Sequence, residues 1–117
     1  MKEIARKALL YDFYGELLTE HQKNVYEDAV MNDFSLSELA EEYGVSRQGI
    51  HDLLKRCDAI LEGYEEKLKL IERFGELKKT ANGLKDDLDE LKDIANRDER
   101  VQKIEAIKEK IAAMESV

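Results

Sequence analysis

The turn around Gly44 constrains the fold of this chain more than any other feature of its sequence. Ser35 followed by Glu38 forms a capping box, in which each side chain accepts a hydrogen bond from the other residue's backbone N–H at a helix start. Gly44 supplies the positive φ that a tight turn between two helices needs, and Ser46 caps the next helix. The pattern predicts a helix over residues 36–43, a short turn and a second helix.

Two such helices form a helix-turn-helix when a small residue lies where they cross and apolar residues join both to the preceding helix. Ala40 fills the crossing position, one helical turn before Gly44. The second helix is expected to continue through Lys55 and beyond. The expected core residues of this unit are Leu36, Leu39, Tyr43, Val45, Ile50 and Leu53. The sequence therefore predicts a helix-turn-helix.

Two more helices are expected before this unit. The segment ARKALLYDFYGELL has the recurrence of a buried helix of about 14 residues. Its apolar face consists of Ile4, Ala8, Leu9, Leu10, Tyr11, Phe13, Tyr14, Leu17 and Leu18. Thr19 and Gln22 form another capping box, so a second helix begins at about Glu20 and stops near residues 32–34. Its apolar positions are Val25, Tyr26, Ala29 and Val30.

From Leu70 onward the apolar residues adopt the alternating spacing of four and three that is typical of coiled coils. The seam consists of Leu70, Phe74, Leu77, Ala81, Leu84, Leu88, Leu91 and Ala95. A turn at residues 96–98 precedes a last amphipathic helix. The apolar residues of that helix are Val101, Ile104, Ile107, Ile111 and Met114. We therefore expect a helix-turn-helix domain over residues 1–69 and a heptad-patterned helical extension over residues 70–117.

The extension has two alternative structures. A lone amphipathic helix leaves its apolar stripe in contact with water, so the stripe needs a cover. We expect a homodimer whose stalk pairs through the seam. The dimer seam consists of Leu77, Leu84, Leu88 and Leu91. The alternative is an intramolecular hairpin in which the last helix covers these residues.

Composition favours an all-α protein. Proline and tryptophan are absent from the 117 residues, and the chain is rich in helix-forming leucine, alanine, glutamate and lysine. The single cysteine, Cys57, cannot form an internal disulfide and is expected to be a small core residue. The aromatic residues near the N-terminus are also expected in the core. They are Tyr11, Phe13, Tyr14 and Tyr26.

The sequence contains no pattern typical of an enzyme. His21 and His51 are far apart and are expected to be polar surface residues, and the adjacent acidic pairs point about 100° apart on a helix. Neither a glycine-rich phosphate loop nor a Cys/His cluster occurs. We therefore expect no catalytic residue, no metal site and no cofactor. Without an apolar run near the roughly 18 residues of a membrane span, or a signal peptide, the expected location is cytoplasmic, with no membrane insertion.

The outward side chains of the second helix of the unit suit contacts with nucleic acid, because Arg pairs well with guanine and Gln with adenine. The candidate nucleic-acid-binding residues are Arg47, Gln48, His51, Lys55 and Arg56. However, residues 35–57 contain three cations and four carboxylates, a net charge of −1, in a chain of net charge −8. Because phosphate neutralisation supplies much of the affinity of DNA-binding domains, we expect weak affinity for free DNA. The alternative is a scaffold for protein contacts.

A resemblance to region 4 of bacterial sigma factors is carried by the run LLTEHQKNVYEDAVMNDFSLSELAEEYGVSRQGIHDLLKR. With YDFYGELLT in front and EGYEEKL behind, the chain more narrowly resembles the YlxM family over residues 8–77. The matching blocks are Asp12 to Gly15, Leu17 to Thr19, Gln22, Ser35-Leu36, Glu38, Ala40 to Glu42, Val45 to Gln48, Lys55-Arg56 and Tyr64 to Leu68. The sigma-like pattern implies nucleic-acid contacts by Arg47, Gln48 and His51.

The resemblance to the YlxM family implies a small cytosolic, regulatory helix-turn-helix protein associated with the signal recognition particle genes. We therefore expect a non-enzymatic regulatory or accessory protein of that pathway. Its expected partners are nucleic acid, as particle RNA or DNA, or the particle GTPase, or both. A sigma-like transcription regulator that reads promoter DNA is the alternative, and a structural adaptor that works through the heptad extension is a third.

Overall fold

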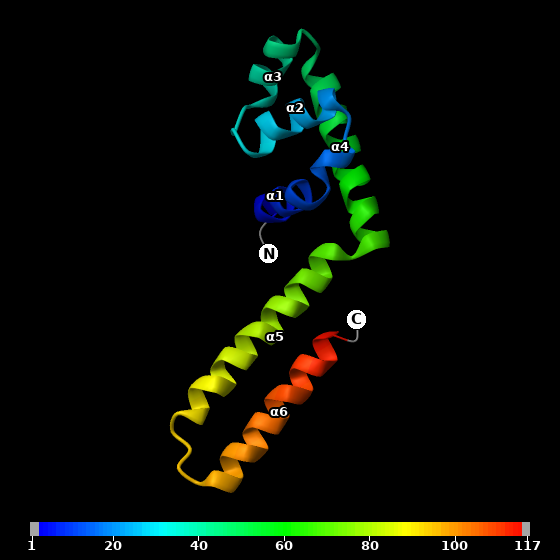
Figure 1. Ribbon diagram of the computed structural model, residues 1–117. Coiled ribbons are helices and arrows are strands. Elements are labelled where there is room, and N and C mark those ends of the chain that lie inside the picture. The colour runs from blue at the N-terminus through cyan, green and yellow to red at the C-terminus, as the bar shows by residue number, and fades with distance from the viewer. Residues whose placement is uncertain (1–2, 116–117) are drawn as a thin grey trace. The chain divides into compact units, whose positions relative to one another are not determined.

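The computed structural model describes residues 3–115, and all regular structure in this range is helical (Figure 1). The elements are α1 (Glu3–Tyr14), the 3-10 helix η1 (Gly15–Leu17), α2 (Glu20–Val30), α3 (Leu36–Tyr43), α4 (Arg47–Leu68), α5 (Leu70–Leu91) and α6 (Arg97–Glu115). The all-α fold class is therefore confirmed. After Ile71 the chain divides into two compact units, called the head unit (residues 3–71) and the tail unit (residues 72–115).

Helix starts in the head unit follow the caps seen in the sequence. Thr19 caps α2 and Ser35 caps α3, and both capping boxes are complete. Ser46 caps α4, where its Oγ accepts a hydrogen bond from the backbone N–H of Gly49 at 3.0 Å. Gly44 ends α3 with φ 66°, in the left-handed region that favours glycine. The predicted starts of α2 and α4 and both ends of α3 are confirmed, whereas α2 ends slightly earlier than expected.

The helix-turn-helix is built on a small buried cluster in which Val25, Leu39 and Ile50 are almost fully enclosed. The predicted residues that pack against this cluster are Leu36, Ala40, Tyr43 and Leu53. The prediction for Val45 was wrong, because its side chain is 49% exposed. Val45 lies in the turn before α4 begins, so the helical spacing that places Ile50 inside does not apply to it.

The first predicted helix is interrupted. α1 ends at Tyr14, and the next residues form a 3-10 turn with three residues per turn. This change of spacing turns Leu17 away from the apolar face, so it is 54% exposed, and Ile4 at the other end is 72% exposed. Both were expected to be buried. Gly15 is required at the interruption, because a Cβ there would lie 2.8 Å from the ring of Tyr11.

A second cluster joins α1, α2 and α4. Its buried members in the head unit are Leu10, Tyr14, Leu18, Tyr26, Cys57, Leu61 and Ile71. The expected core roles of Cys57 and of the N-terminal aromatic residues are confirmed, since Tyr11 and Phe13 pack against this cluster. Burial raises the pKa of the Cys57 thiol to about 11.

Tyrosine–carboxylate hydrogen bonds cross-link the helices of the head unit. In each pair the phenol donates to an Asp or Glu on another helix. The pairs are Tyr11–Glu27, Tyr14–Glu65, Tyr26–Asp58 and Tyr43–Asp28. Desolvation, followed by the bond to Glu27, raises the pKa of Tyr11 to about 12, and the bond to Asp28 is the largest cause of a similar rise for Tyr43. The sequence contained no local signal for these pairs.

One of these pairs lies where α4 ends. Lys69 adopts a left-handed conformation with φ 55° and separates α4 from α5. The buried carboxylate of Glu65 accepts hydrogen bonds from the phenol of Tyr14 and from the backbone N–H of Ile71. The phenol oxygen accepts in turn from the N–H of Leu70, at 3.2 Å. These bonds satisfy the first N–H groups of α5, which have no partners within their own helix.

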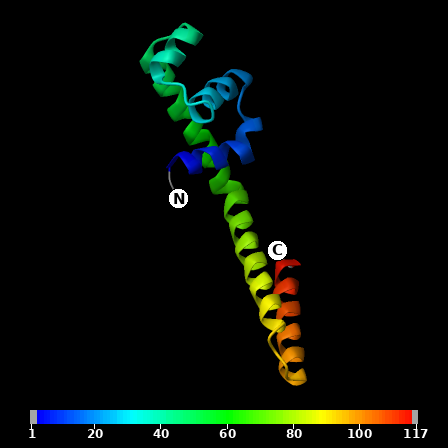
Figure 2. The same cartoon turned by 90° about the vertical axis from the view of Figure 1, so that its left-hand side faces the viewer.

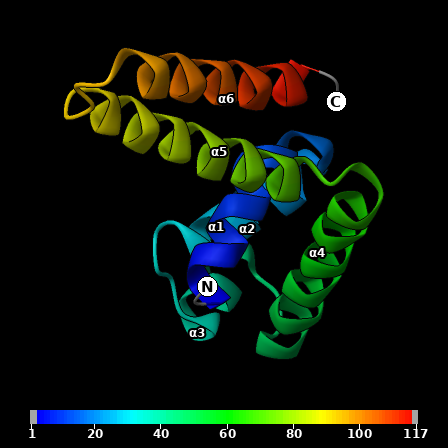
Figure 3. The ribbon, with the colours of Figure 1, turned by 90° about the horizontal axis from the view of Figure 1, so that it is seen from below.

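In the tail unit, α5 and α6 run antiparallel and side by side, as the three views agree (Figure 1, Figure 2 and Figure 3). The carboxylate of Asp87 on α5 lies 2.6 Å from the Lys110 ammonium and 3.2 Å from that of Lys103, both on α6. Lys103 also pairs with Glu90 at 2.7 Å. Hydrogen bonds from Lys110 and Lys103 hold the pKa of Asp87 below its usual value. The single chain thus forms the helical hairpin that the sequence left as an alternative.

The connection between the two tail helices spans residues 92–96, slightly before the predicted turn at 96–98. Asn96 caps α6, because its Oδ1 accepts a hydrogen bond from the backbone N–H of Glu99 at 3.1 Å. Ala95 therefore lies outside α5, and the seam ends with the helix at Leu91. The predicted last helix is confirmed as α6.

Candidate nucleic-acid interface

The candidate residues occupy the first three turns of α4. The cap at Ser46 fixes where the helix starts, so Arg47 and Gln48 fall in its first turn. His51 follows in the second turn, and Lys55 and Arg56 in the third. Arg47, His51 and Lys55 are spaced four residues apart, so they follow one another along one side of α4, with Gln48 beside this row and Arg56 turned by about 100° from Lys55.

The structure places most of these side chains in solvent. Arg47, Gln48, Lys55 and Arg56 are exposed, and His51 is half-buried. On the opposite side of the same turns, Ile50 is 1% exposed and lies in the core. The fold therefore supplies an exposed helical surface held rigidly from behind, which is the arrangement of a recognition helix.

Asp52 belongs to the same surface, although sequence reasoning did not include it among the candidate contacts. The side-chain amide of Gln48 donates a hydrogen bond to Oδ1 of Asp52 at 2.9 Å, and Nδ1 of His51 lies 3.6 Å from that oxygen. An amide and a carboxylate four residues apart on a helix form such pairs, so the spacing of Gln48 and Asp52 was the available signal. The carboxylate places negative charge in the middle of the candidate site.

The cations of this surface differ from two other cations of the head unit. Arg6 pairs with Glu62 at 2.9 Å, and Lys23 pairs with Glu16 at 3.0 Å. The hydrogen bond to Glu62 raises the pKa of Arg6 above its usual value. By contrast, within residues 3–115 the candidate cations on α4 take part in no ion pair. These cations are Arg47, Lys55 and Arg56. They are available to an external anion.

A small hollow lies at the start of this surface, where the first residue of α3 meets the first turns of α4. It has a volume of about 330 Å³ and is lined by Leu36, Arg47, Gln48 and His51. A guanidinium and an amide beside an apolar wall can donate hydrogen bonds to a phosphate or to the acceptor edge of a base. The structure thus brings three of the five candidate residues together and leaves Lys55 and Arg56 further along α4.

Comparison with known protein families identifies the family of this chain. Residues 1–101 match the model of the UPF0122 family, described as "Putative helix-turn-helix protein, YlxM / p13 like". The chain belongs to the UPF0122 family. The resemblance seen in the sequence and the helix-turn-helix are therefore both confirmed.

Members of the UPF0122 family are 42–49% identical to this chain over the aligned segments. The UPF0122 protein YlxM of Bacillus subtilis (strain 168) is 48% identical over 86 residues, which cover 74% of this chain and 78% of the relative. A UPF0122 protein of Thermoanaerobacter sp. (strain X514) is 42% identical over 96 residues, 82% of this chain and 81% of the relative. One from Desulforamulus reducens is 49% identical over 80 residues, 68% of each chain. The aligned lengths exceed the head unit.

Over residues 3–115, every helix is too short or too polar to cross a bilayer.

Proposed function

We propose that this UPF0122 protein is a non-enzymatic accessory or regulatory protein of the signal recognition particle pathway that binds the particle RNA through the exposed surface of α4. The proposal is supported by the resemblance to the YlxM family and by one structural observation. Arg47 in the first turn of α4, and Lys55 and Arg56 in its third turn, are exposed and have no carboxylate partners among the described residues.

Three available cations set the scale of the electrostatic contribution. Neutralising three phosphates of a single strand gives a dependence of log K on log salt of about −2. This is small beside the slopes of proteins with many phosphate contacts, so binding must also use shape or base contacts. The side chains in and beside the hollow, Arg47, Gln48 and His51, can provide them.

The charge of α3 favours a folded RNA over duplex DNA. In helix-turn-helix proteins on DNA, the first helix crosses the phosphate backbone while the second enters the major groove. Here the first helix, α3, carries exposed Glu38, Glu41 and Glu42. These carboxylates would repel a continuous duplex backbone, whereas an RNA loop or bulge can reach α4 without passing α3.

The test is a binding titration of the full chain with purified particle RNA at physiological salt. We expect saturable binding that weakens about tenfold or more when Arg47, Lys55 and Arg56 are all replaced by Ala, at roughly 0.5 kcal/mol or more per contact. The matched control replaces Lys79, Lys85 and Lys92 of the tail unit, which are exposed and change the net charge equally. The absence of RNA binding, or equal losses in both triple variants, would overturn the proposal.

The particle GTPase is the second expected partner, and a separate binding experiment tests it. Immobilised GTPase, with and without the RNA, would be tested for retention of the full chain. Retention that requires the GTPase alone and survives the α4 substitutions would assign the contact to another surface. Retention only in the presence of RNA would support binding through the RNA.

A sigma-like reader of promoter DNA is the alternative, favoured by the Ser46-capped start of α4 and by the Arg47-Gln48 pair in its exposed first turn. Selection from random duplexes tests it directly. An enriched sequence motif that disappears when Arg47→Ala and Gln48→Ala are combined would support this reading. No enriched motif, or one unchanged in the double variant, would reject it.

A further inference from the structure

The tail unit buries little apolar surface. Among residues 72–115, Asp87 and Ile107 are the side chains with less than a tenth of their surface exposed. Large apolar residues on both helices remain exposed to solvent. Their exposed fractions are 43% for Leu77, 52% for Leu88, 48% for Val101 and 43% for each of Ile104 and Ile111. A unit this small with so little buried apolar surface is at best marginally stable by itself and gains from an additional source of stability.

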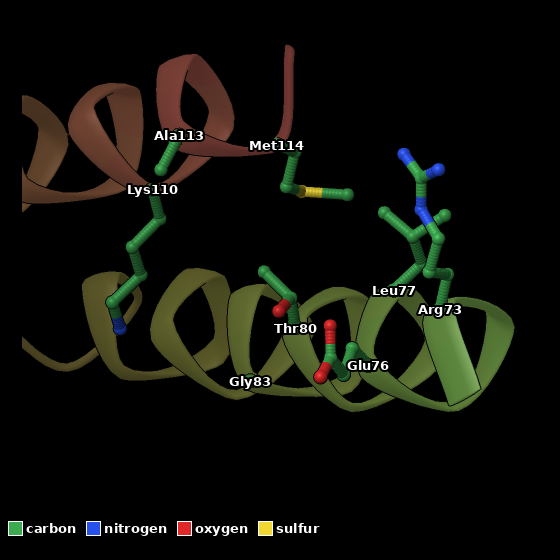
Figure 4. A pocket seen from close by; sticks show the side chains of 8 residues that line it. All are labelled: Arg73, Glu76, Leu77, Thr80, Gly83, Lys110, Ala113 and Met114. Carbon is green, nitrogen blue, oxygen red and sulfur yellow. The ribbon is translucent and has the colours of Figure 1, made fainter. Parts of the chain in front are cut away.

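The space between the helices shows the same loose packing. A cavity of about 530 Å³ lies between α5 and α6 and is lined by Arg73, Glu76, Leu77, Thr80, Gly83, Lys110, Ala113 and Met114. In Figure 4, Leu77 and Met114 extend toward the space between the two helices without closing it. Closely packed helices leave few voids larger than a water molecule. α6 therefore covers only part of the apolar surface of α5.

Helix geometry gives the direction of the uncovered residues. Asp87 contacts Lys103 and Lys110, so these three mark the sides on which the two helices face each other. Leu88 follows Asp87 by one position and is therefore turned by about 100° around α5. Ile104 and Ile111 follow Lys103 and Lys110 in the same way, also turned by about 100°.

Because the helices are antiparallel, these two rotations have opposite sense when viewed from one end, and both lead to the same side of the hairpin. Leu77 lies close to the direction of Leu88, three helical turns earlier, where this side of the hairpin borders the cavity between the helices. Leu77 and Leu88 thus share one surface with Ile104 and Ile111, which we call the hairpin face. Leu84 and Leu91, the other two members of the predicted seam, are half-buried one turn from Asp87 on its side of α5.

The hairpin face is large enough for an interface. The exposed parts of its four residues, with Val101 at its edge, amount to roughly 400 Å², the size at which apolar patches mark interaction sites. A standard interface buries about 800 Å² on each partner, of which a little over half is apolar. The apolar area available on one hairpin therefore matches what one partner of a stable dimer contributes.

We propose that a second copy of this chain docks on the hairpin face, so that two hairpins form a four-helix bundle. A two-fold axis brings the same surface of both subunits together, so a face that is apolar on both helices is complementary to itself. Four helices enclose a central core, which two helices cannot do. The interface consists of Leu77, Leu88, Ile104 and Ile111, from both helices, in place of a seam on α5 alone.

The first test is sedimentation of the full chain over a range of concentrations. We expect a dimer whose dissociation constant rises roughly tenfold to a hundredfold when Leu88→Lys and Ile104→Lys are combined, as for charges placed in an apolar interface. The control is Leu17→Lys in the head unit, a leucine of similar exposure at 54%. A wild-type monomer at every concentration, or a dimer equally unaffected by both changes, would overturn the proposal.

A second measurement covers the case in which the lysine variants lose their helices. Leu88→Ala with Ile104→Ala keeps good helix propensity while removing most of the apolar contact. The midpoint of thermal unfolding should rise with protein concentration in the wild type, because dimerisation stabilises the folded state by mass action. The rise should be smaller in the alanine variant. A midpoint independent of concentration in the wild type, or the same rise in both proteins, would also overturn the proposal.

Discussion

The side-chain amide of Gln48 donates a hydrogen bond to Oδ1 of Asp52, one turn further along the exposed side of α4, at 2.9 Å. The bond uses a donor of Gln48 and places a carboxylate among the candidate cations. Asp52→Asn removes the charge without changing the size of the side chain. We expect RNA affinity to increase roughly threefold to tenfold, since like charges in a binding surface oppose association. A binding titration at constant salt measures the change.

Net charge alone could produce a gain of this kind, so a control is needed. Asp86→Asn in the tail unit removes an exposed carboxylate and changes the net charge equally. If both variants gain the same affinity, Asp52 has no local role in the candidate site. A gain confined to Asp52→Asn indicates that this carboxylate lies next to the bound phosphates or bases.

Lys55 should contribute through phosphate contact. Lys55→Ala is expected to weaken RNA binding similarly for different sequences and to make the slope of log K against log salt shallower by about 0.7 to 1. Affinities measured at several salt concentrations give the slope. Lys23→Ala is the matched control, because Lys23 lies in the same unit but already pairs with Glu16 at 3.0 Å. A slope unchanged by Lys55→Ala would remove this residue from the interface.

Alanine substitutions at Gly44 and Gly63 distinguish the effect of a positive φ from the general effect of glycine on stability. In both positions a Cβ would meet nothing within 4 Å, but Gly44 has φ 66° whereas Gly63 lies inside α4. Gly44→Ala should lower the free energy of unfolding by about 1–2 kcal/mol, the cost of a left-handed residue with a Cβ. Gly63→Ala should raise it by about 0.5–1 kcal/mol. Urea unfolding compares them, and equal shifts would contradict this assignment.

The hydroxyl of Tyr14 should stabilise the head unit through its hydrogen bonds to Glu65 and Leu70. Tyr14→Phe leaves the buried carboxylate of Glu65 and the N–H of Leu70 each without one hydrogen-bond partner. We expect a loss of about 1–3 kcal/mol in the free energy of unfolding. Tyr64→Phe is the control, since its ring stacks on Tyr14 at 6.1 Å and remains in place. A loss as large in the control would show that the hydrogen bonds are not the cause.

Alkaline pH should destabilise the head unit through its tyrosines. The pKa values of Tyr11 and Tyr43 are raised to about 12, above the value of about 10 in an unfolded chain. Their contribution to stability is therefore complete below pH ~10 and is lost as the pH rises toward ~12, because the unfolded chain releases its phenol protons first. Tyr11→Phe should reduce the slope of unfolding free energy against pH in this window. An identical slope in the variant would contradict the raised pKa.

Local signals in the sequence predicted the secondary structure of the head unit well. Each capping box depends on two residues three positions apart, so Thr19 with Gln22 and Ser35 with Glu38 could be recognised without knowing the fold. Gly44 identified the turn for the same reason. Val45 and Leu17 were assigned wrongly because helical spacing was extended through a turn and a 3-10 helix, where it does not hold.

Long-range partners could not be predicted. Glu65 is buried against Tyr14, which lies on another helix, and a single glutamate in a polar helix gives no sign of this. In the tail, the heptad pattern predicted an apolar stripe but not which part of it α6 would cover. On α4 the outward side could be read from the spacing of Ile50. The pairing of Gln48 with Asp52, and the absence of carboxylate partners for the cations there among the described residues, became visible only in the structure.

Because Cys57 is buried, the reactivity of its thiol reports local unfolding of the head unit. Cys57 is the single cysteine of the sequence, lies fully enclosed on α4 between the candidate interface and the end of that helix, and has a thiol pKa raised to about 11. Alkylating reagents attack the thiolate, so they can modify this residue only when the head unit opens. The tail unit contributes no thiol signal. The rate of alkylation, with and without RNA, would therefore measure how strongly a bound ligand stabilises the head unit, in the unmodified wild-type chain.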